Sequence, residues 1–473
     1  MIDFDAPYTL SIDGQAASAE AQLAVINPAT GAVFARCPAA GSAELDRAVQ
    51  AARRAFGAWR ELGFAERAAY IGRLAQAITA EVEPLAALLT REQGKPLQQS
   101  REEIARAATL SVGMTALQIT PQVLHDDAQR FIELRYVALG VVGIITPWNA
   151  PINLAIGPLT SALYTGNCVV LKPSPFTPLC TLRLGELMRA IFPPGVVNVL
   201  AGGDELGALM TAHPHIDKIS FTGSVATGKK VMASAAGTLK RLTLELGGND
   251  AAIVLDDVDP VAVAKKLFFA ATVNSGQVCM AIKRIYAHES VYEALCTALT
   301  AEAQSARLGN GLEASSSLGP IQNQRQYQRV REFIADLTQG PGTVLTGREQ
   351  PEGPGYFVAP VVVAEPGEHS RIVCEEQFGP VIPVMKFSDE QDAVRRANDT
   401  RFGLSGSVWS KDVARATALA AQLEVGTAWV NQHRLTMADV PFGGAKESGL
   451  GRTYSLLGLQ GYMEPRVVSV LKG

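Results

Sequence analysis

The sequence predicts an α/β protein built around a doubly wound parallel sheet, accompanied by a second α/β domain. After residue 140, short runs of β-branched residues follow one another, and segments with helical spacing separate most of them. The runs lack the in/out alternation of a half-exposed strand, which indicates a sheet covered on both faces. The chain has 473 residues, too many for one hydrophobic core, so two or three domains are expected.

Composition excludes several classes of protein. Apolar residues make up 47% and charged residues 19%, which is typical of a globular chain, and the net charge of −4 gives no sign of a nucleic-acid partner. The stretch 136–171 has no charged residue, but three prolines interrupt it, so we expect no membrane span. The six cysteines form no CxxC pair, and the first ten residues have no basic segment. We therefore expect a cytoplasmic protein without a metal site or a disulfide framework.

The first part of the chain reads as helices, from 43 to about 117. Ser42 is a plausible N-cap for the first of them, because apolar residues recur at helical spacing after it. A second amphipathic run extends from near Phe64 to Gly94, a residue type that commonly ends helices.

The parallel sheet is predicted from six runs, with helices at 177–192 and 224–236 between them. A second alternating series extends from about 260 to 430. Residues 129–138 and 466–471 read as strands without an intramolecular partner, and exposed strands of this kind need one, which points to an oligomer. The six runs are 141–145, 168–171, 196–200, 217–221, 241–246 and 251–255, and the strand candidates of the second series are 358–363, 380–385, 406–410 and 427–431.

Two motifs have plain structural interpretations. The segment GSVATGKK (223–230) matches a phosphate-binding loop, but Lys230 stands where Ser or Thr should hold magnesium, so a nucleotide triphosphatase is disfavoured. A helix start after a parallel strand can still receive a pyrophosphate. His213 and His215 have no thiol or carboxylate ligand near them in the sequence and read as loop residues.

One cysteine, Cys279, occurs in the same chain as several motifs that indicate a catalytic role. Cys279 lies among small residues in NSGQVCMA, Glu245 opens ELGGND after a strand, and Asn149 lies in PWNAP after another strand. The loops EEQFGP (375–380) and PFGGAKESG (441–449) complete the set. Together these motifs resemble the aldehyde dehydrogenase superfamily, in the family's order and with its 34-residue interval between the glutamate and the cysteine.

The resemblance covers nearly the whole chain, from INPATG (26–31) to the terminal strand. It implies a small β oligomerisation element beside the two α/β domains, and a homodimer or homotetramer. The implied division is a coenzyme-binding domain at 1–120 and 139–244, a catalytic domain at 245–440, and oligomerisation strands at 121–138 and 454–473.

The resemblance also implies oxidation of an aldehyde to its acid with NAD or NADP. A thiolate adduct makes the aldehyde a good hydride donor, an amide stabilises the oxyanion, and a carboxylate activates the water that hydrolyses the thioester. Cys279, Asn149 and Glu245 take these three roles. Two alternatives stay open: a CoA-acylating semialdehyde dehydrogenase, against which Glu245 argues, and a non-catalytic binding protein on the same scaffold.

The implied coenzyme site has one departure from the common pattern. Many NAD-preferring members have Glu three positions after the lysine of LKPSP, and this chain has Pro175. NAD is still favoured, because no cationic residue other than Lys172 lies near Pro175 to bind a 2′-phosphate. The expected coenzyme-binding residues are Thr146, Trp148, Lys172, Gly223, Ser224, Glu376 and Phe378.

Residues expected to face the aldehyde suggest its type. Ala150 stands where many members have an aromatic residue, and Arg434 offers a cation for a carboxylate or a phenolic oxygen, although it can instead pair with Asp439. We therefore expect bulky aromatic or acid-bearing aldehydes rather than acetaldehyde. The candidate substrate-binding residues are Ala150, Val278, Met280, His433 and Arg434.

Overall fold

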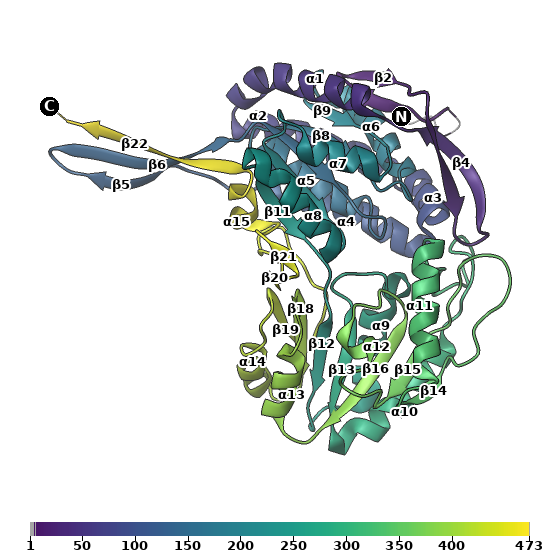
Figure 1. Cartoon of the computed structure of the whole chain (residues 1–473). Helices are drawn as coiled ribbons and strands as arrows, with labels where there is room; N and C mark the ends of the chain where they lie inside the picture. Colours follow the sequence, from purple (N-terminus) through teal and green to yellow (C-terminus); the bar gives the residue numbers. More distant parts are fainter. Residues whose placement is uncertain (1–3, 5, 473) are drawn as a thin grey trace.

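The largest sheet, with eight strands, carries the doubly wound topology that the sequence predicts. The computed structural model describes residue 4 and residues 6–472. In it, this sheet has the strand order β2-β1-β9-β8-β7-β10-β11-β21 (Figure 1). The strands are β1 (Leu10–Ile12), β2 (Gln15–Ala17), β7 (Val141–Ile145), β8 (Cys168–Lys172), β9 (Val197–Val199), β10 (Lys218–Thr222), β11 (Arg241–Glu245) and β21 (Gly449–Leu450).

The chain changes direction within this sheet between β7 and β10. From β7 it builds outward through β8 and β9, and it then returns to place β10 against the other side of β7, all in parallel. The crevice at the carboxyl ends of two such strands is the place where open α/β sheets bind ligands. The intervening helices are α5 (Asn153–Tyr164), α6 (Leu179–Ile191), α7 (Asp204–Ala212) and α8 (Val225–Ala235), followed by the 3₁₀ turn η1 (Ala236–Thr238).

Four helices lie between β2 and β7 in the chain, and their ends differ in two places from the sequence-based expectation. The first helix begins at Ser42, and its N-cap is Gly41, whose N–H donates to the Glu44 carboxylate at 2.9 Å. The run from Phe64 to Gly94 is two helices that break at Glu81, because the chain must turn there to pack both on the same core. The helices are α1 (Ser42–Glu61), α2 (Phe64–Ala80), α3 (Val82–Gln93) and α4 (Leu97–Thr115), and a hairpin of β3 (Gln22–Asn27) and β4 (Ala32–Pro38) lies before them.

A second sheet has the order β14-β15-β16-β13-β12-β18-β19. It includes residues 250–254, which the sequence pattern grouped with the first sheet, because β12 pairs with β13 and β18 rather than with β11. Local sequence does not specify which neighbour a buried strand finds. The strands are β12 (Asp250–Val254), β13 (Ile282–His288), β14 (Thr343–Thr346), β15 (Val361–Ala364), β16 (Val381–Phe387), β18 (Ser405–Trp409) and β19 (Thr427–Val430).

Helices cover both faces of the second sheet, so successive side chains of its strands enter two different apolar clusters. On one face, Ala252 and Val254 pack with α9 and α10. On the other face, Ile253 packs with α11, α13 and α14. The remaining elements of this region are α9 (Pro260–Thr272), η2 (Val273–Gly276), α10 (Glu289–Ser305), α11 (Gln324–Leu337), α12 (Arg371–Cys374), α13 (Glu390–Asn398) and α14 (Val413–Ala420), with β17 (Phe402–Gly403) paired to β20 (Ala445–Lys446).

A three-stranded arm projects from the body and ends in the C-terminal strand (Figure 1). It consists of β5 (Gln122–Asp126), β6 (Arg130–Ala138) and β22 (Met463–Leu471), which follows α15 (Ser455–Gln460). The expectation of strands without an intramolecular partner is therefore wrong, since β22 pairs with β6 over nine residues. A pairing across more than 300 residues leaves no local signal. Among the described residues, no helix is long and apolar enough to cross a membrane.

Candidate active site

The loop that carries Cys279 follows a left-handed turn at the end of α9. Asn274, Ser275 and Gly276 have φ values of 52°, 54° and 74° within and at the end of η2. Gly276 is required there, because a Cβ would lie 2.3 Å from the carbonyl oxygen of Gly379. The Gln277 amide then donates to the Asn274 carbonyl at 2.8 Å, and its oxygen accepts from the Gln322 N–H at 2.8 Å. These bonds hold the half-buried Cys279 at a defined place before β13.

Burial controls the protonation of this thiol. Burial, helped by the nearby carboxylates of Glu376, Asp250 and Glu245, raises the pKa of Cys279 to about 12, and the Lys283 ammonium opposes this shift. Without coenzyme and substrate, the side chain is therefore a neutral thiol at pH 7. For Cys279 to act as a nucleophile, a base or a change of surroundings has to generate its thiolate.

Lys283 is a residue that sequence reasoning missed. Its side chain is 2% exposed, and its ammonium donates to the Cys279 carbonyl at 2.6 Å and to the Val278 carbonyl at 2.9 Å. The Glu376 carboxylate lies 4.0 Å away. The same group therefore ties down the nucleophile loop and supplies the only favourable charge among the causes of the Cys279 pKa shift. It has little signal in the sequence, because Lys283 is followed by a second cation, Arg284, in β13.

Asn149 follows β7 and reaches the same loop. Its amide nitrogen donates to the Gln277 carbonyl at 2.9 Å, and its backbone carbonyl accepts from Asn274 Nδ2 at 2.8 Å. A side-chain amide has two N–H groups, so one is left for a ligand. The structure thus brings Asn149 and the Cys279 loop together, although 130 residues separate the two side chains in the chain.

A buried ion pair holds the backbone of Asn149 in place. Lys95 Nζ lies 2.5 Å from the Glu103 carboxylate and donates to the Asn149 carbonyl at 2.9 Å, and both side chains are nearly inaccessible. The other Glu103 oxygen accepts from the Ile152 N–H at 2.9 Å. Sequence reasoning missed this pair. The signal available in the sequence was a glutamate on the face of α4 that also carries Ile104 and the other buried residues of this helix.

Glu245 ends β11 and lies on the other side of the site. It is 7% exposed, and both carboxyl oxygens are buried without a hydrogen-bond partner. Burial raises the pKa of Glu245 well above its ordinary value, and Arg452 opposes the shift only in part. Gly443 leaves room for the carboxyl group, because a Cβ there would lie 2.9 Å from Glu245 Oε1. A raised pKa and an unsatisfied carboxyl group are typical of a catalytic base that awaits water.

Several candidate coenzyme residues lie at the switch point of the first sheet. Thr146 follows β7, and its hydroxyl oxygen is buried without a partner. Gly223 and Ser224 follow β10, and the Ser224 hydroxyl caps α8 by accepting from the Thr227 N–H at 3.2 Å. Lys172 ends β8, and burial lowers its pKa to about 8. An orphaned hydroxyl, a helix N-terminus and a buried ammonium fit a ligand with phosphates and ribose hydroxyls.

The remaining coenzyme candidates come from different elements and meet near the nucleophile. Trp148 and Phe378 contact each other edge to face with 5.4 Å between ring centroids. Glu376 accepts from the N–H of Gly248 at 3.0 Å, and Gly248 lies three residues after Glu245 in the chain. Burial raises the pKa of Glu376 and the Lys283 charge lowers it. Glu376 is therefore joined to the segment after Glu245 and, through the charge of Lys283, to the loop that carries Cys279.

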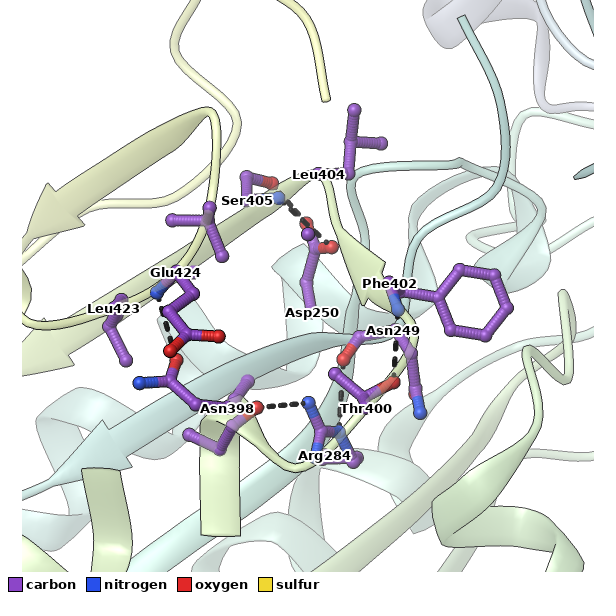
Figure 2. Close-up of a pocket in the computed structure, with 15 residues that line it drawn as sticks. Asn249, Asp250, Arg284, Asn398, Thr400, Phe402, Leu404, Ser405, Leu423 and Glu424 are labelled. Carbon is purple, nitrogen blue, oxygen red and sulfur yellow. Dashed lines mark hydrogen bonds between the residues drawn. The ribbon is translucent and has the colours of Figure 1, made fainter. Parts of the chain in front are cut away.

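A pocket at the start of β12 has polar groups that mostly satisfy one another (Figure 2). Asp250 accepts from the Ser405 hydroxyl and N–H, and Arg284 donates to the Asn249 carbonyl at 2.9 Å and the Ala397 carbonyl at 2.8 Å. This network anchors the turn after Glu245 to the second sheet. The network also includes the Asp250 carboxyl. Burial raises the pKa of Asp250 to about 7, and the charge of this carboxyl in turn raises the pKa of Cys279.

The candidate substrate residues divide into two groups. Ala150, Val278 and Met280 are half-buried beside Asn149 and Cys279. His433 does not join them as a binding group, because its imidazole is fully buried, donates to the Met280 carbonyl at 3.1 Å and accepts from the Ser407 hydroxyl at 2.9 Å. Burial lowers its pKa to about 3, so it stays neutral. Its place in the structure indicates that it holds the loop beside the thiol.

The other motifs have the plain roles expected of them. His213 ends α7 and lies 3.0 Å from the Asp46 carboxylate, and its Nδ1 accepts from the His215 N–H. No group of metal-binding side chains occurs in the part of the chain that the structure describes. Thr453, in the loop after β21, pairs with Phe442 through its backbone.

Comparison with known proteins decides the family. The model of the aldehyde dehydrogenase family matches residues 15–468. The chain belongs to this family. It is 37% identical to a putative aldehyde dehydrogenase of Gibberella fujikuroi over 100% of both chains, and 38% identical to a mitochondrial succinate-semialdehyde dehydrogenase of rice over 94% of this chain and 85% of the relative.

Solved structures show the same fold. An aldehyde dehydrogenase from Bacillus cereus superposes with a TM-score of 0.96 at 36% identity, covering 98% of this chain and 97% of the other. A betaine aldehyde dehydrogenase from Staphylococcus aureus in complex with NAD⁺ has a TM-score of 0.94 at 32% identity, with coverage of 98% and 97%. An E. coli NADP-dependent enzyme has a TM-score of 0.96 at 32% identity and 98% coverage of both chains. This aldehyde dehydrogenase is thus an oxidoreductase that acts on aldehyde groups with a nicotinamide coenzyme.

Proposed function

We propose that Cys279, Asn149 and Glu245 carry out the oxidation, and that water rather than a second thiol releases the acid. The supporting observation is the convergence of a half-buried thiol, an amide with a free N–H and an orphaned carboxyl group from three separate elements. No other cysteine among the described residues has both such an amide and such a carboxyl group near it. Cys37, Cys168, Cys180 and Cys296 are buried in the cores, and Cys374 is exposed.

The reaction begins after the Cys279 thiol has lost its proton: the thiolate Sγ adds to the aldehyde carbon, and the electron pair of the C=O π bond moves to the oxygen of the resulting thiohemiacetal. The negative charge that develops on oxygen accepts hydrogen bonds from the Asn149 amide and the Cys279 N–H, which need no reorientation. The nicotinamide coenzyme, when bound, serves as the hydride acceptor. Loss of hydride from the adduct leaves a thioester on Cys279.

Glu245 then deacylates the enzyme. Its carboxylate takes a proton from water, the water oxygen attacks the thioester carbon, and the bond between that carbon and Cys279 Sγ breaks to release the acid. A carboxyl group with a raised pKa is well matched to this task near neutral pH. The CoA-acylating alternative has no need for such a base, and the non-catalytic alternative has no need for any of the three residues.

On the coenzyme, we favour NAD over NADP. Lys172, Thr146, Gly223, Ser224, Trp148, Glu376 and Phe378 would hold it. Asp204 and Glu205 begin α7, and the Asp204 carboxylate acts on the Lys172 pKa, so it lies within electrostatic range of the expected ribose. A carboxylate there repels a 2′-phosphate, and Pro175 adds no cation. We expect Asp204→Asn to improve kcat/KM with NADP⁺ several-fold and to leave NAD⁺ nearly unchanged; a wild type tenfold more efficient with NADP⁺ would contradict the preference.

The proposed function is tested by a panel of aldehydes with NAD⁺ or NADP⁺, followed at 340 nm. Cys279→Ala should abolish oxidation and retain coenzyme binding by calorimetry. Cys374→Ala is the matched control and should keep wild-type turnover, because its thiol is exposed and its hydrogen bond goes to the Glu368 carbonyl at 3.1 Å. A Cys279→Ala variant with a tenth of the wild-type rate would exclude Cys279 as the nucleophile.

Assembly and location follow as further parts of the proposal. The arm presents exposed apolar side chains, which favours a homodimer or homotetramer that covers them. They are Val123, Leu124, Val467, Val470 and Leu471. The free cysteines favour a reducing compartment such as the cytoplasm.

A further inference from the structure

The loop after β19 places a cation close to the nucleophile. Arg434 has φ 71°, a left-handed conformation unusual for arginine, and its Nε is buried without a hydrogen-bond partner. Its guanidinium lies 5.7 Å from the centroid of the Phe269 ring, which is 56% exposed. The preceding residue, His433, donates to the Met280 carbonyl at 3.1 Å, which holds this loop beside the residue that follows Cys279. Cys279 also acts on the pKa of Arg434, so the two groups lie within electrostatic range. The guanidinium therefore contacts the exposed ring of Phe269 and lies in the electrostatic surroundings of the thiol.

A second guanidinium is held to the same loop. Arg106, from α4, donates to the Thr436 carbonyl at 2.7 Å and to the Thr436 hydroxyl. Arg106 lowers the pKa of Arg434 and, at the other side, that of Tyr454, a buried residue on whose pKa Cys279 and Glu245 also act. Two cations from distant parts of the chain thus converge on the approach to the catalytic residues.

These charges are poorly compensated. Burial and the Arg106 charge lower the pKa of Arg434 to about 10, so it stays protonated at pH 7. The one carboxylate that opposes this shift, Glu102, is exposed and accepts from Gln98 at 2.9 Å. Asp439, the alternative partner considered for Arg434 from the sequence, forms no ion pair with it among the described residues. Like charges held together in partial burial favour an anionic ligand.

We infer that the aldehyde substrate carries a carboxylate at the end remote from its aldehyde group, and that Arg434 and Arg106 bind that carboxylate. The inference rests on the proposed function, since it assumes that the aldehyde carbon reaches Cys279. A guanidinium matches a carboxylate with two parallel hydrogen bonds, and the free Nε of Arg434 is one available donor. The same pair disfavours aldehydes with a cationic far end.

The test compares 4-formylbenzoate with 4-formylbenzamide, which has the same size and no charge. Wild-type kcat/KM should be at least tenfold higher for the acid. Arg434→Met and Arg106→Met should each lower kcat/KM for the acid at least tenfold and change it less than twofold for the amide. Arg101→Met is the matched control on α4, because Arg101 is paired with Glu83 at the surface, and it should change neither value.

A second measurement needs no coenzyme and no turnover. Terephthalate, which has a carboxylate at each end, should slow alkylation of Cys279 by iodoacetamide in the wild type but not in Arg434→Met. Equal kcat/KM for acid and amide in the wild type, or equal losses of both in Arg434→Met, would overturn the inference and leave the proposed reaction standing. Failure of both coenzymes with every aldehyde of the panel would instead overturn the proposed reaction, even if terephthalate protected the thiol.

Discussion

In the proposed mechanism, the protonation of Glu245 determines when the enzyme can release its product. Its carboxyl group must lose a proton before it can act as a base, and burial holds its pKa well above the ordinary value. Deacylation should therefore accelerate as pH rises through that pKa and level off above it. Glu245→Gln should retain a burst of reduced coenzyme, slow the steady phase by about 10²–10⁴ and lose this pH dependence.

Stopped-flow absorbance between pH 6 and 10 separates the two phases. Glu447→Gln serves as control, since that carboxylate pairs with Lys229 at the surface. Complete loss of the burst in Glu245→Gln would mean that Glu245 activates the thiol instead of water.

The Asn149 amide is the second prediction at the residue scale. Asn149→Ala should lower kcat by about 10²–10³, the usual effect of removing one oxyanion donor. It should leave the rate of Cys279 alkylation near the wild-type value, because that reaction forms no oxyanion. An effect confined to KM would assign Asn149 to substrate binding alone.

Among the elements, the junction between η2 and β13 determines the reactivity of the nucleophile. Lys283 is buried in β13, where its ammonium bonds the loop carbonyls and opposes the upward pKa shift of the thiol. Lys283→Met should move the pH profile of Cys279 alkylation to higher pH and reduce the free energy of unfolding by about 1–3 kcal/mol for the unsatisfied carbonyls. Lys283→Arg should restore part of the profile, because it keeps the charge.

The control for this variant is Lys218→Met. Lys218 is a lysine of β10 that is 1% exposed, but it does not contribute to the Cys279 pKa. Its replacement should change stability without changing the alkylation profile. An alkylation profile that is the same in Lys283→Met and in the wild type would show that Lys283 does not act on the thiol.

At the scale of the whole molecule, the three-stranded arm of β5, β6 and β22 leaves apolar side chains exposed. Val470→Asp and Leu471→Asp keep the pairing of β22 with β6 but put charge on its exposed apolar surface. They should shift the protein toward smaller species in light scattering, and truncation after Pro465 should give monomers or aggregates. An unchanged mass for the aspartate variants and the truncation would show that the arm is not an assembly surface.

Much of the fold could be predicted from the sequence, because buried parallel strands and amphipathic helices have local patterns. The runs at 141–145 and 168–171 became β7 and β8 nearly unchanged. Helix ends were less certain: Gly41 rather than Ser42 caps α1, since a backbone N–H bound to Glu44 can replace a side-chain cap. Cys279, Glu245 and Asn149 were identifiable because each lies in a short motif next to a strand or helix end.

What the sequence by itself determined is therefore the order of elements and the family, and it predicted the three residues of the proposed reaction; all of these depend on neighbours along the chain. Only the tertiary structure decided which strands pair: β12 joined the second sheet, and β22 found β6. It also showed that His433 is a buried, neutral support and that Lys95, Glu103, Lys283 and Arg106 act on the site. The physical reason is the same in each case: burial, charge and hydrogen bonding depend on which distant segments come within a few ångströms, and no local pattern records that.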